Sequence, residues 1–345
     1  MPDRPAPNSY NRDVYHGGDL AHAKGLYGQG PDGWLDLSTG INPVPYPIPD
    51  CPEKVWHRLP ESDLEDALLS AARRYYSLHD EADLVALPGT QAALQLLPLL
   101  RPMSRVDILG PTYAEHGTCW RRGGHHVTER GTLDQIGRDT DVAVIVNPNN
   151  PDGRLVPIPA LQAVAKTQAE KGGWTIIDEA FMDVMPENSL AGVPPLPGTV
   201  ILKSIGKFFG LAGLRLGFAM GDPALIRTIR EHLGPWAVSG IAAFAGKTAL
   251  SDTPWITATR QQLAESRTRL ATLLDNQWMT PVGGTDLFTL VETHHAATIF
   301  DALCTRHILI RPFPERPQFL RFGLPGSERD WRRLETALEE ILPRL

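Results

Sequence analysis

The chain has 345 residues, of which 21% are charged and 42% hydrophobic, and its formal net charge at pH 7 is -7. This composition is ordinary for a globular protein and excludes wholesale disorder. The negative charge argues against a broad nucleic-acid surface, because phosphate backbones are held mainly by clusters of Lys and Arg.

Three features of the sequence bear on where the protein works. Its cysteines, Cys51, Cys119 and Cys304, are too few and too scattered for a disulfide framework, so a reducing compartment is favoured. The N-terminus has no apolar core of the signal-peptide type, and no apolar run approaches the length of a membrane span. We therefore expect a cytoplasmic protein that binds neither membranes nor nucleic acid.

The first part of the chain changes character near residue 60. Residues 1–60 are rich in Pro and Gly, and we expect them to form an extended arm that joins the smaller domain. The first strong helical pattern covers 62–76, where Ser62 and Glu65 have capping-box spacing.

A series of short apolar runs follows this helix. Several are continuous rather than alternating, as is typical of strands covered on both faces, and helical patterns separate some of them. The alternation predicts an α/β fold with a mainly parallel central sheet, in a large domain at 61–238. The predicted strands are 84–87, 106–109, 142–146, 174–177 and 200–202.

The last third of the chain has a different pattern. Helical patterns at 223–233 and 254–276 precede two predicted strands at 287–292 and 307–313, and an amphipathic helix is predicted at 327–342. We expect residues 239–345 to form a smaller α+β domain.

Short polar loops follow the five predicted strands: PGTQ, GPTY, NPNNPDG, DEAF and KSIGK. In open α/β sheets, ligands bind beyond the carboxyl ends of the strands. The sequence therefore predicts one site assembled from these loops.

Two lysines stand four residues apart at the last of these loops. Lys203 fits an ordinary surface or strand-end position, whereas Lys207 lies among the polar loops. A lysine amine becomes a nucleophile toward carbonyl groups when nearby cations or partial desolvation lower its pKa. Arg215 is a candidate for such a cation and, with Ser204, for holding a phosphate, since a guanidinium offers bidentate geometry.

Four further loop residues are candidates for binding a cofactor or substrate. Gly89 and Thr90 stand at a predicted helix start, where free N–H groups favour a phosphate. Asp178 is either a loop acid or the partner of a protonated pyridine nitrogen, a contact that makes such a ring an electron sink. Tyr113 is either a core aromatic or stacks on a flat heterocycle.

Taken in order, PGTQ, GPTY, NPNNPDG, DEAF and SIGK followed by GLRLG resemble the motifs of the fold type I pyridoxal-phosphate enzymes, the aminotransferase class I/II superfamily. The resemblance spans nearly the whole chain. It implies an aminotransferase-like fold, pyridoxal 5'-phosphate as cofactor and a homodimer.

The same resemblance implies roles for individual residues. Lys207 would bind the cofactor aldehyde covalently, Asp178 would pair with the pyridine nitrogen, and Asn150 would hydrogen-bond the ring 3-oxygen. Tyr113 would stack on the ring. The cofactor phosphate would be surrounded by Gly89, Thr90, Gln91, Ser204 and Arg215.

A narrower resemblance concerns the substrate. YHGGDL (15–20) and WLDLSTGINPVPYP (34–47) are similar to the cobalamin-pathway L-threonine-O-3-phosphate decarboxylases, which are relatives of histidinol-phosphate aminotransferases. The HGG element favours the decarboxylases, which implies the product (R)-1-amino-2-propanol O-2-phosphate. An aminotransferase of the histidinol-phosphate type is the alternative. The residues implied around the small phosphorylated substrate are His16, Gly40, Arg311 and Arg321.

Four positions depart from the pattern of these families. Leu59 and Phe181 each stand where many relatives have Tyr, Gly40 replaces Asn, and Pro325 replaces Arg. The last two changes remove direct phosphate contacts of enterobacterial-type decarboxylases. Serine phosphate or another phosphorylated amino acid therefore stays open as the substrate.

Other classes fit less well. Ser204-x-x-Lys207 has the spacing of penicillin-binding serine enzymes, but the other elements of that class are absent in their required order. The stretch 240–248 is one residue too long for a P-loop, so we expect an ordinary helix. The histidines of 123–129 suggest a solvated turn more than a metal site. No basic helix pair of a DNA-binding regulator precedes residue 62.

Overall fold

The computed structural model describes residues 17–344, and in them the chain forms two compact units. The larger unit is Pro45–Gln261, and the smaller one combines the residues up to Val44 with those from Gln262 onward. These boundaries differ from the expected ones at 60 and 238, because residues 45–60 and 239–261 pack with the larger unit. Among the described residues, no helix is long and apolar enough to cross a bilayer.

Helix packing explains the difference in boundaries. Helix α8 (Gly240–Ser251) packs against α2 (Lys54–His57) and α3 (Ser62–Tyr75). Its glycines permit this approach, since a Cβ at Gly240 would lie 3.0 Å from Val55 and one at Gly246 would lie 3.0 Å from Leu68.

The larger unit is built on a seven-stranded sheet with the strand order β2-β8-β7-β6-β5-β3-β4. Only β8 runs antiparallel to its neighbours, so the sheet is mainly parallel, as the sequence predicts. The strands are β2 (Asp83–Leu87), β3 (Arg105–Leu109), β4 (His126–Arg130), β5 (Val142–Val146), β6 (Trp174–Asp178), β7 (Thr199–Ser204) and β8 (Gly217–Gly221).

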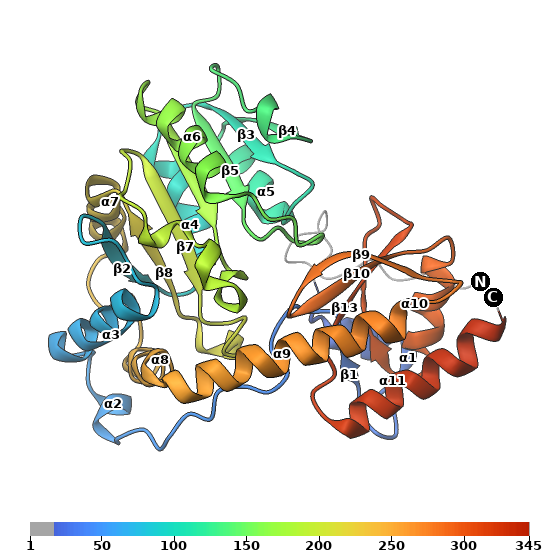
Figure 1. Ribbon diagram of the computed structural model, residues 1–345. Helices are drawn as coiled ribbons and strands as arrows, with labels where there is room; N and C mark the ends of the chain where they lie inside the picture. Colours follow the sequence, from blue (N-terminus) through green and yellow to red (C-terminus); the bar gives the residue numbers. More distant parts are fainter. Residues whose placement is uncertain (1–16, 345) are drawn as a thin grey trace. The chain divides into compact units, whose positions relative to one another are not determined.

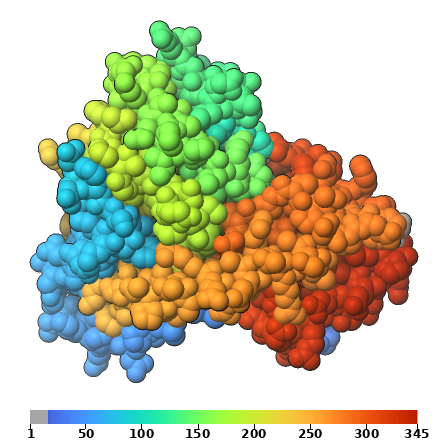
Figure 2. All heavy atoms as spheres, viewed as in Figure 1, coloured from blue at the N-terminus to red at the C-terminus, as the bar shows by residue number. Residues whose placement is uncertain are grey.

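Helices cover both faces of this sheet (Figure 1). Val200 and Leu202 of β7 belong to a core that includes residues of α4, α5 and α7. Ile201 points to the opposite face, because successive strand residues alternate, and it lies near Ala165 of α6. Figure 2 shows how the side chains around α6 hide the strands on that face. The helices on its two faces are α4 (Thr90–Leu96), α5 (Ala114–Arg122), α6 (Ile158–Ala169) and α7 (Pro223–Leu233). Helix α9 (Thr253–Leu274) begins in the larger unit and continues into the smaller one, since the boundary follows Gln261.

The smaller unit contains a four-stranded antiparallel sheet in the order β12-β13-β10-β9 and a parallel pair, β1-β11. Ala23 of α1 packs with Cys304 and Leu309, which ties the described N-terminal residues to this unit. Its elements are α1 (Leu20–Tyr27), β1 (Leu35–Asp36), β9 (Thr280–Thr285), β10 (Phe288–Glu292), α10 (Ala296–Cys304), β11 (Ile308–Leu309), β12 (Arg311–Pro312), β13 (Phe319–Gly323) and α11 (Glu328–Ile341).

One local prediction is wrong, and a second is right only in part, since Gly123 and Gly124 form a turn and His126 is exposed. Helix α3 begins with Glu61 as its N-cap and has no side-chain cap hydrogen bond, so Ser62 lies inside the helix and forms no capping box. His125 is not in a solvated turn. It is buried, its Nδ1 accepts from the Ser104 backbone N–H (3.2 Å), and its Nε2 lies 2.7 Å from the Pro98 carbonyl oxygen. Within residues 17–344 no group of three potential metal ligands occurs.

Candidate active site

The ends of β2 and β7 meet at the start of β8. Gly217, the first residue of β8, pairs with Leu87 on one side and with Ser204 on the other. A Cβ at Gly217 would lie 2.9 Å from the Lys203 carbonyl oxygen and 3.0 Å from the Thr90 nitrogen. The missing side chain therefore lets the loops that follow β2 and β7 approach each other.

These loops form a cradle around Arg215. Gly89 has φ +79°, and a Cβ there would lie 2.5 Å from Nη2 of Arg215, so only glycine fits. Arg215 is itself left-handed (φ 53°), and its Nη1 donates to the Ala212 carbonyl (3.0 Å). Ser204 is buried, and its Oγ accepts from the Gly206 N–H (3.3 Å). A guanidinium, a hydroxyl and the start of α4 at Thr90 together suit a phosphate group.

Gln91 lies beside this cradle, but its side chain is directed elsewhere. Its Nε2 donates to Oε2 of Glu115 over 3.1 Å. Gln91 can therefore contribute to the phosphate cradle only through its backbone N–H, which lies beside that of Thr90 in the first turn of α4.

Asp178 is the last residue of β6, and it is buried. Its Oδ2 lies 2.9 Å from Nε2 of His116, which is 2% exposed, and its Oδ1 accepts from the Ala180 N–H over 3.0 Å. His116 on α5 was not predicted as a site residue, although Tyr113-x-x-His116 places two aromatic residues on one helix face. The ring centres of Tyr113 and His116 are 6.1 Å apart. This arrangement fixes the direction of the carboxylate.

Lys207 lies in a loop that is anchored by its neighbours. Phe208 and Phe209 are fully buried, and the Phe209 ring stacks on Trp255 at 5.6 Å. Lys207 is half-buried, and its Nζ lies 5.5 Å from the centre of the Phe181 ring. The buried aromatic side chains thus hold the loop in place. The Lys207 amine extends toward Phe181, which stands where many relatives have Tyr.

Of the two positions that the sequence suggests for Lys203, the strand end is right and the surface is wrong. Its side chain is 2% exposed, and its Nζ lies 2.5 Å from Oε2 of Glu179 and 2.9 Å from Oγ of Ser189. Because β7 alternates, Lys203 and Ser204 point to opposite faces of the sheet. Lys203 is therefore a buried structural cation behind the site.

Asn150 follows β5 in a loop that two other asparagines fix in place. Asn147 both accepts from the Val156 N–H (2.8 Å) and donates to the Val156 carbonyl (3.2 Å), while Asn149 donates to the Pro111 carbonyl (2.9 Å). Asn150 directly follows the second of these anchors and is half-buried. Asn147 and Asn149 are thus structural residues within the predicted motif.

The smaller unit holds the other predicted residues. Arg311 and Arg321 are direct partners in the β12–β13 register, and Arg321 is 6% exposed. Burial, together with the charge of Arg311, lowers the pKa of Arg321 to about 9, and Asp36 opposes this shift. Two guanidiniums side by side, one of them buried, favour a bound anion.

The loop that contains Gly40 lies against β13. Nη2 of Arg321 donates to the Ser38 carbonyl (2.8 Å), and a Cβ at Gly323 would lie 2.4 Å from the Thr39 carbonyl oxygen. Gly40 is buried. His16 lies outside the described residues. The structure therefore brings Arg311, Arg321 and the residues just before Gly40 together.

The remaining departures from the family pattern have different surroundings. Leu59 is 62% exposed, Phe181 is 5% exposed, and Pro325 is buried. Of the three, Phe181 is the one that lies near Lys207.

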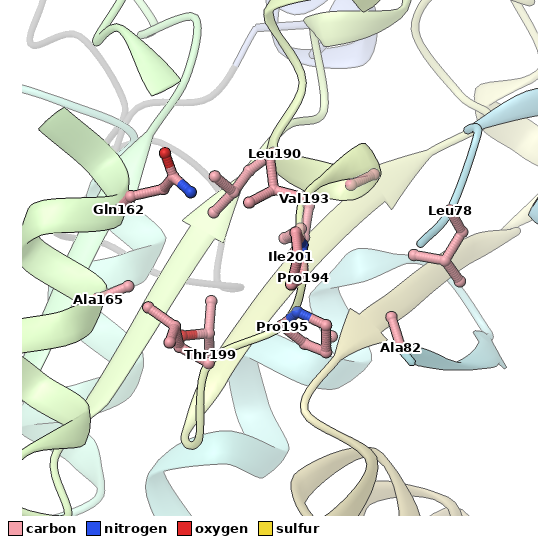
Figure 3. Close-up of a pocket in the computed structure, with 13 residues that line it drawn as sticks. Leu78, Ala82, Gln162, Ala165, Leu190, Val193, Pro194, Pro195, Thr199 and Ile201 are labelled. Atoms are coloured by element: carbon pink, nitrogen blue, oxygen red, sulfur yellow. The ribbon is translucent and has the colours of Figure 1, made fainter. Parts of the chain in front are cut away.

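A separate cavity lies at the other end of β7 and is not the candidate site (Figure 3). It has an empty volume of about 350 Å³, part of which is open to solvent, and it reaches Thr199, the first residue of β7. None of its described lining residues is charged. The lining includes Leu78, Ala165, Leu190, Val193, Pro195 and Ile201.

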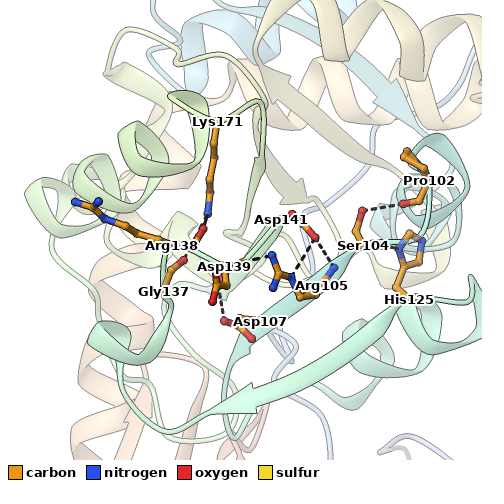
Figure 4. A network of polar contacts seen from close by, with 11 residues as sticks. Pro102, Ser104, Arg105, Asp107, His125, Gly137, Arg138, Asp139, Asp141 and Lys171 are labelled. Atoms are coloured by element: carbon orange, nitrogen blue, oxygen red, sulfur yellow. Dashed lines mark hydrogen bonds and ion pairs between the residues drawn. The ribbon is translucent and has the colours of Figure 1, made fainter.

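Polar contacts hold the amino ends of the strands (Figure 4). Arg105 at the start of β3 lies 3.8 Å from Asp141 and 4.0 Å from Asp139, and Lys171 donates to the Arg138 carbonyl over 2.6 Å. Exposed ion pairs of this kind add little stability. The predicted site residues of the larger unit lie instead at the carboxyl ends of the strands.

Comparison with known proteins decides the family. The model of the family described as aminotransferase class I and II matches residues 52–338. The chain belongs to this family. It is 44% identical to a threonine-phosphate decarboxylase of Pseudomonas aeruginosa, over 94% of this chain and 96% of that protein. It is 42% identical to a threonine-phosphate decarboxylase of Sinorhizobium sp, over 95% and 98%.

The fold is shared with a solved structure. A histidinol-phosphate aminotransferase from Sinorhizobium meliloti, solved in complex with pyridoxal-5'-phosphate, superposes with a TM-score of 0.78 at 18% identity and covers 96% of each chain. The predicted family and the predicted aminotransferase-like fold are confirmed. The GIAAFAGKT stretch forms most of α8, as expected of an ordinary helix.

Proposed function

We propose that this chain is a pyridoxal-phosphate-dependent decarboxylase that converts L-threonine O-3-phosphate into (R)-1-amino-2-propanol O-2-phosphate in cobalamin biosynthesis. The observation that carries this proposal is the near-full-length similarity to two threonine-phosphate decarboxylases, at 44% and 42% identity. The candidate site is consistent with it, because it offers a lysine, a buried acid and a phosphate cradle on one sheet edge.

The cradle supports pyridoxal 5'-phosphate as the cofactor. Arg215 and Ser204 would hold its phosphate against Gly89, where a side chain would collide with the guanidinium. Asp178, oriented by His116, would hold the pyridine nitrogen, and Asn150 and Tyr113 would contact the ring. When bound, this cofactor supplies a ring that accepts the electron pair released at the substrate α-carbon.

Lys207 would have two tasks. Its Nζ would bind the cofactor aldehyde until the substrate amine displaces it. Once released, this nitrogen would take up a proton, and as an ammonium group it would donate that proton to the α-carbon from which carbon dioxide has left. The buried Phe208 and Phe209 fix the backbone on which this amine moves.

Arg321 and Arg311 would bind the phosphate of the substrate. Their adjacent charges suit a dianion better than a single carboxylate. With the phosphate held there, the carboxylate stays free to turn out of the cofactor plane, which favours its loss over the loss of the α-proton.

We also propose a cytoplasmic homodimer. Trp56 and Trp236 are 61% and 56% exposed, and the close approach of Val55 to Gly240 brings their segments together on the larger unit. Large exposed aromatic side chains are typical of a protein interface. Size-exclusion chromatography with light scattering tests this, since a monomeric mass would contradict it.

The reaction is tested with purified holoenzyme and L-threonine O-3-phosphate, with and without 2-oxoglutarate, while carbon dioxide and glutamate are measured. Release of carbon dioxide without 2-oxoglutarate supports the decarboxylase. Glutamate formation without carbon dioxide would instead support the aminotransferase alternative. Parallel assays with L-serine O-phosphate and histidinol phosphate identify the preferred substrate.

A further inference from the structure

Asp36 and Ser38 form an oriented chain of hydrogen bonds in the smaller unit. Oδ1 of Asp36 accepts from the Ser38 N–H (2.9 Å) and from the Ser38 hydroxyl (2.6 Å). The hydroxyl has one proton, which it donates to Asp36, so its oxygen is left to accept from the Gly18 N–H (2.7 Å). The Asp36 carboxylate thus fixes which group donates and which accepts in each of these hydrogen bonds.

The same segment contacts Arg321 on its other side. The Ser38 carbonyl accepts from Nη2 of Arg321 (2.8 Å), and the Leu37 carbonyl accepts from the Gly323 N–H (2.7 Å). A Cβ at Gly17 would lie 2.4 Å from the Ser38 carbonyl oxygen. Ser38 is completely buried between the Gly17–Gly18 turn and β13.

We propose that Asp36 and Ser38 are positioning residues for the substrate anion, acting through Arg321 and through the turn at Gly17–Gly18. This inference rests on the proposed function, in which Arg321 binds the substrate phosphate. Neither side chain needs to touch the substrate. Asp36 holds Ser38 in place, the Ser38 carbonyl aims the guanidinium, and the Ser38 hydroxyl holds the turn that follows His16.

The effect on the kinetics follows from this placement. A misaimed guanidinium weakens substrate binding, whereas Lys207 and Asp178 belong to the other unit and keep their own supports. Loss of Asp36 or of the Ser38 hydroxyl is therefore expected to raise KM and to leave kcat nearly unchanged.

Four variants of the holoenzyme test the proposal. Asp36→Ala removes the acceptor, Asp36→Asn keeps an acceptor oxygen without the charge, and Ser38→Ala removes only the hydroxyl. Asp32→Asn is the matched control, since this exposed acid of the same unit pairs with Arg329 (3.1 Å). The measurements are kcat and KM for L-threonine O-3-phosphate, and hydrogen exchange of the peptides that contain Gly18 and Ser38.

For Asp36→Ala we expect KM to rise about tenfold with kcat within about twofold, a change typical of one or two lost hydrogen bonds. The KM of Asp36→Asn should lie much closer to that of the unmodified enzyme than the KM of Asp36→Ala does. Ser38→Ala should raise KM about threefold and speed exchange at Gly18. Asp32→Asn should change neither quantity.

The proposal is wrong if KM and exchange at Gly18 match those of the unmodified enzyme in both Asp36→Ala and Ser38→Ala. A fall in kcat at constant KM would also contradict it. If the unmodified enzyme does not act on threonine phosphate, the proposed function fails. In that case, faster exchange at Gly18 and Ser38 would still support the hydrogen-bond chain, and unchanged exchange would refute it. Should Asp36→Ala not fold, Ser38→Ala alone decides.

Discussion

The carboxyl edge of the large sheet and the surroundings of Arg321 are built in different ways. At the sheet edge, Asp178 and Ser204 are the last residues of β6 and β7, and Lys207 follows three residues later, so strand pairing sets their positions. Around Arg321, the deciding hydrogen bonds join residues 20 and 283 positions apart, from Gly18 to Ser38 and from Ser38 to Arg321.

This difference has a consequence for how each region tolerates change. A site set by backbone pairing survives many substitutions around it, provided that the functional side chains remain. A site set by a few long-range contacts with side chains changes with single residues. The proposed cofactor site is therefore expected to be constant within the family, while the smaller unit varies with the substrate.

The strongest test of the sheet edge is Lys207→Ala. We expect kcat to fall at least about a thousandfold, because both the covalent hold on the cofactor and the proton donor disappear. The visible absorption of the bound cofactor should disappear as well. Activity assays and absorption spectra of the purified protein measure both effects.

Lys207→Arg is the control for this prediction, since it keeps the positive charge and lacks a nucleophilic amine. It should be as inactive as Lys207→Ala. Borohydride reduction of the unmodified enzyme followed by peptide mapping should label residue 207, and a label elsewhere would remove the basis of the proposed mechanism.

Lys203→Met tests whether the neighbouring lysine is purely structural. It leaves Glu179 buried without its counter-ion, and the loss of one partner of a buried pair costs about 3–5 kcal/mol of unfolding free energy. Folded protein should keep kcat within a few-fold. Denaturant titration and the specific activity of the folded fraction measure the two effects separately.

The double variant Lys203→Met, Glu179→Gln is the matched control, because it removes both charges and should recover part of the lost stability. A stable Lys203→Met protein with a hundredfold lower kcat would show instead that Lys203 takes part in the chemistry.

The sequence predicts the positions of those candidate residues that directly follow a predicted strand. Five apolar runs and the polar residues after them predicted the sheet and the residues along its edge, since parallel strands place their carboxyl ends together. Strands β4 and β8 were not predicted, because HVTER is largely exposed and GFAMG contains two glycines. The pairing of His116 with Asp178 and the burial of Lys203 against Glu179 join residues that are remote in sequence, so the spacing of Tyr113 and His116 alone does not reveal them.

The smallest expected effect concerns Asp183, which is buried near Lys203. The Tyr75 hydroxyl is its side-chain hydrogen-bond partner. Burial raises its pKa from an ordinary 3.8 to about 6, and the charge of Lys203 opposes this shift. The folded state therefore retains the proton between about pH 4 and 6, where the unfolded state releases it.

The sign of the effect on stability follows directly. Because the folded pKa is raised, Asp183 costs nothing below the unfolded pKa, and its cost grows as pH rises to about 6, reaching roughly 3 kcal/mol. Asp183→Asn lacks this titration, so its stability relative to the unmodified enzyme should increase between pH 4.5 and 7.5. Guanidinium titrations at both values, with excess cofactor, measure it.

A constant difference across this range would show that Asp183 titrates normally and that the charges behind the sheet edge balance one another. If the difference in stability grows with pH while kcat is unchanged, the buried charges near Asp183 affect stability and are separate from the charged groups of the candidate site. The larger unit would then contain buried charges that affect its stability and, on the other side of the same strands, the groups that act on the substrate.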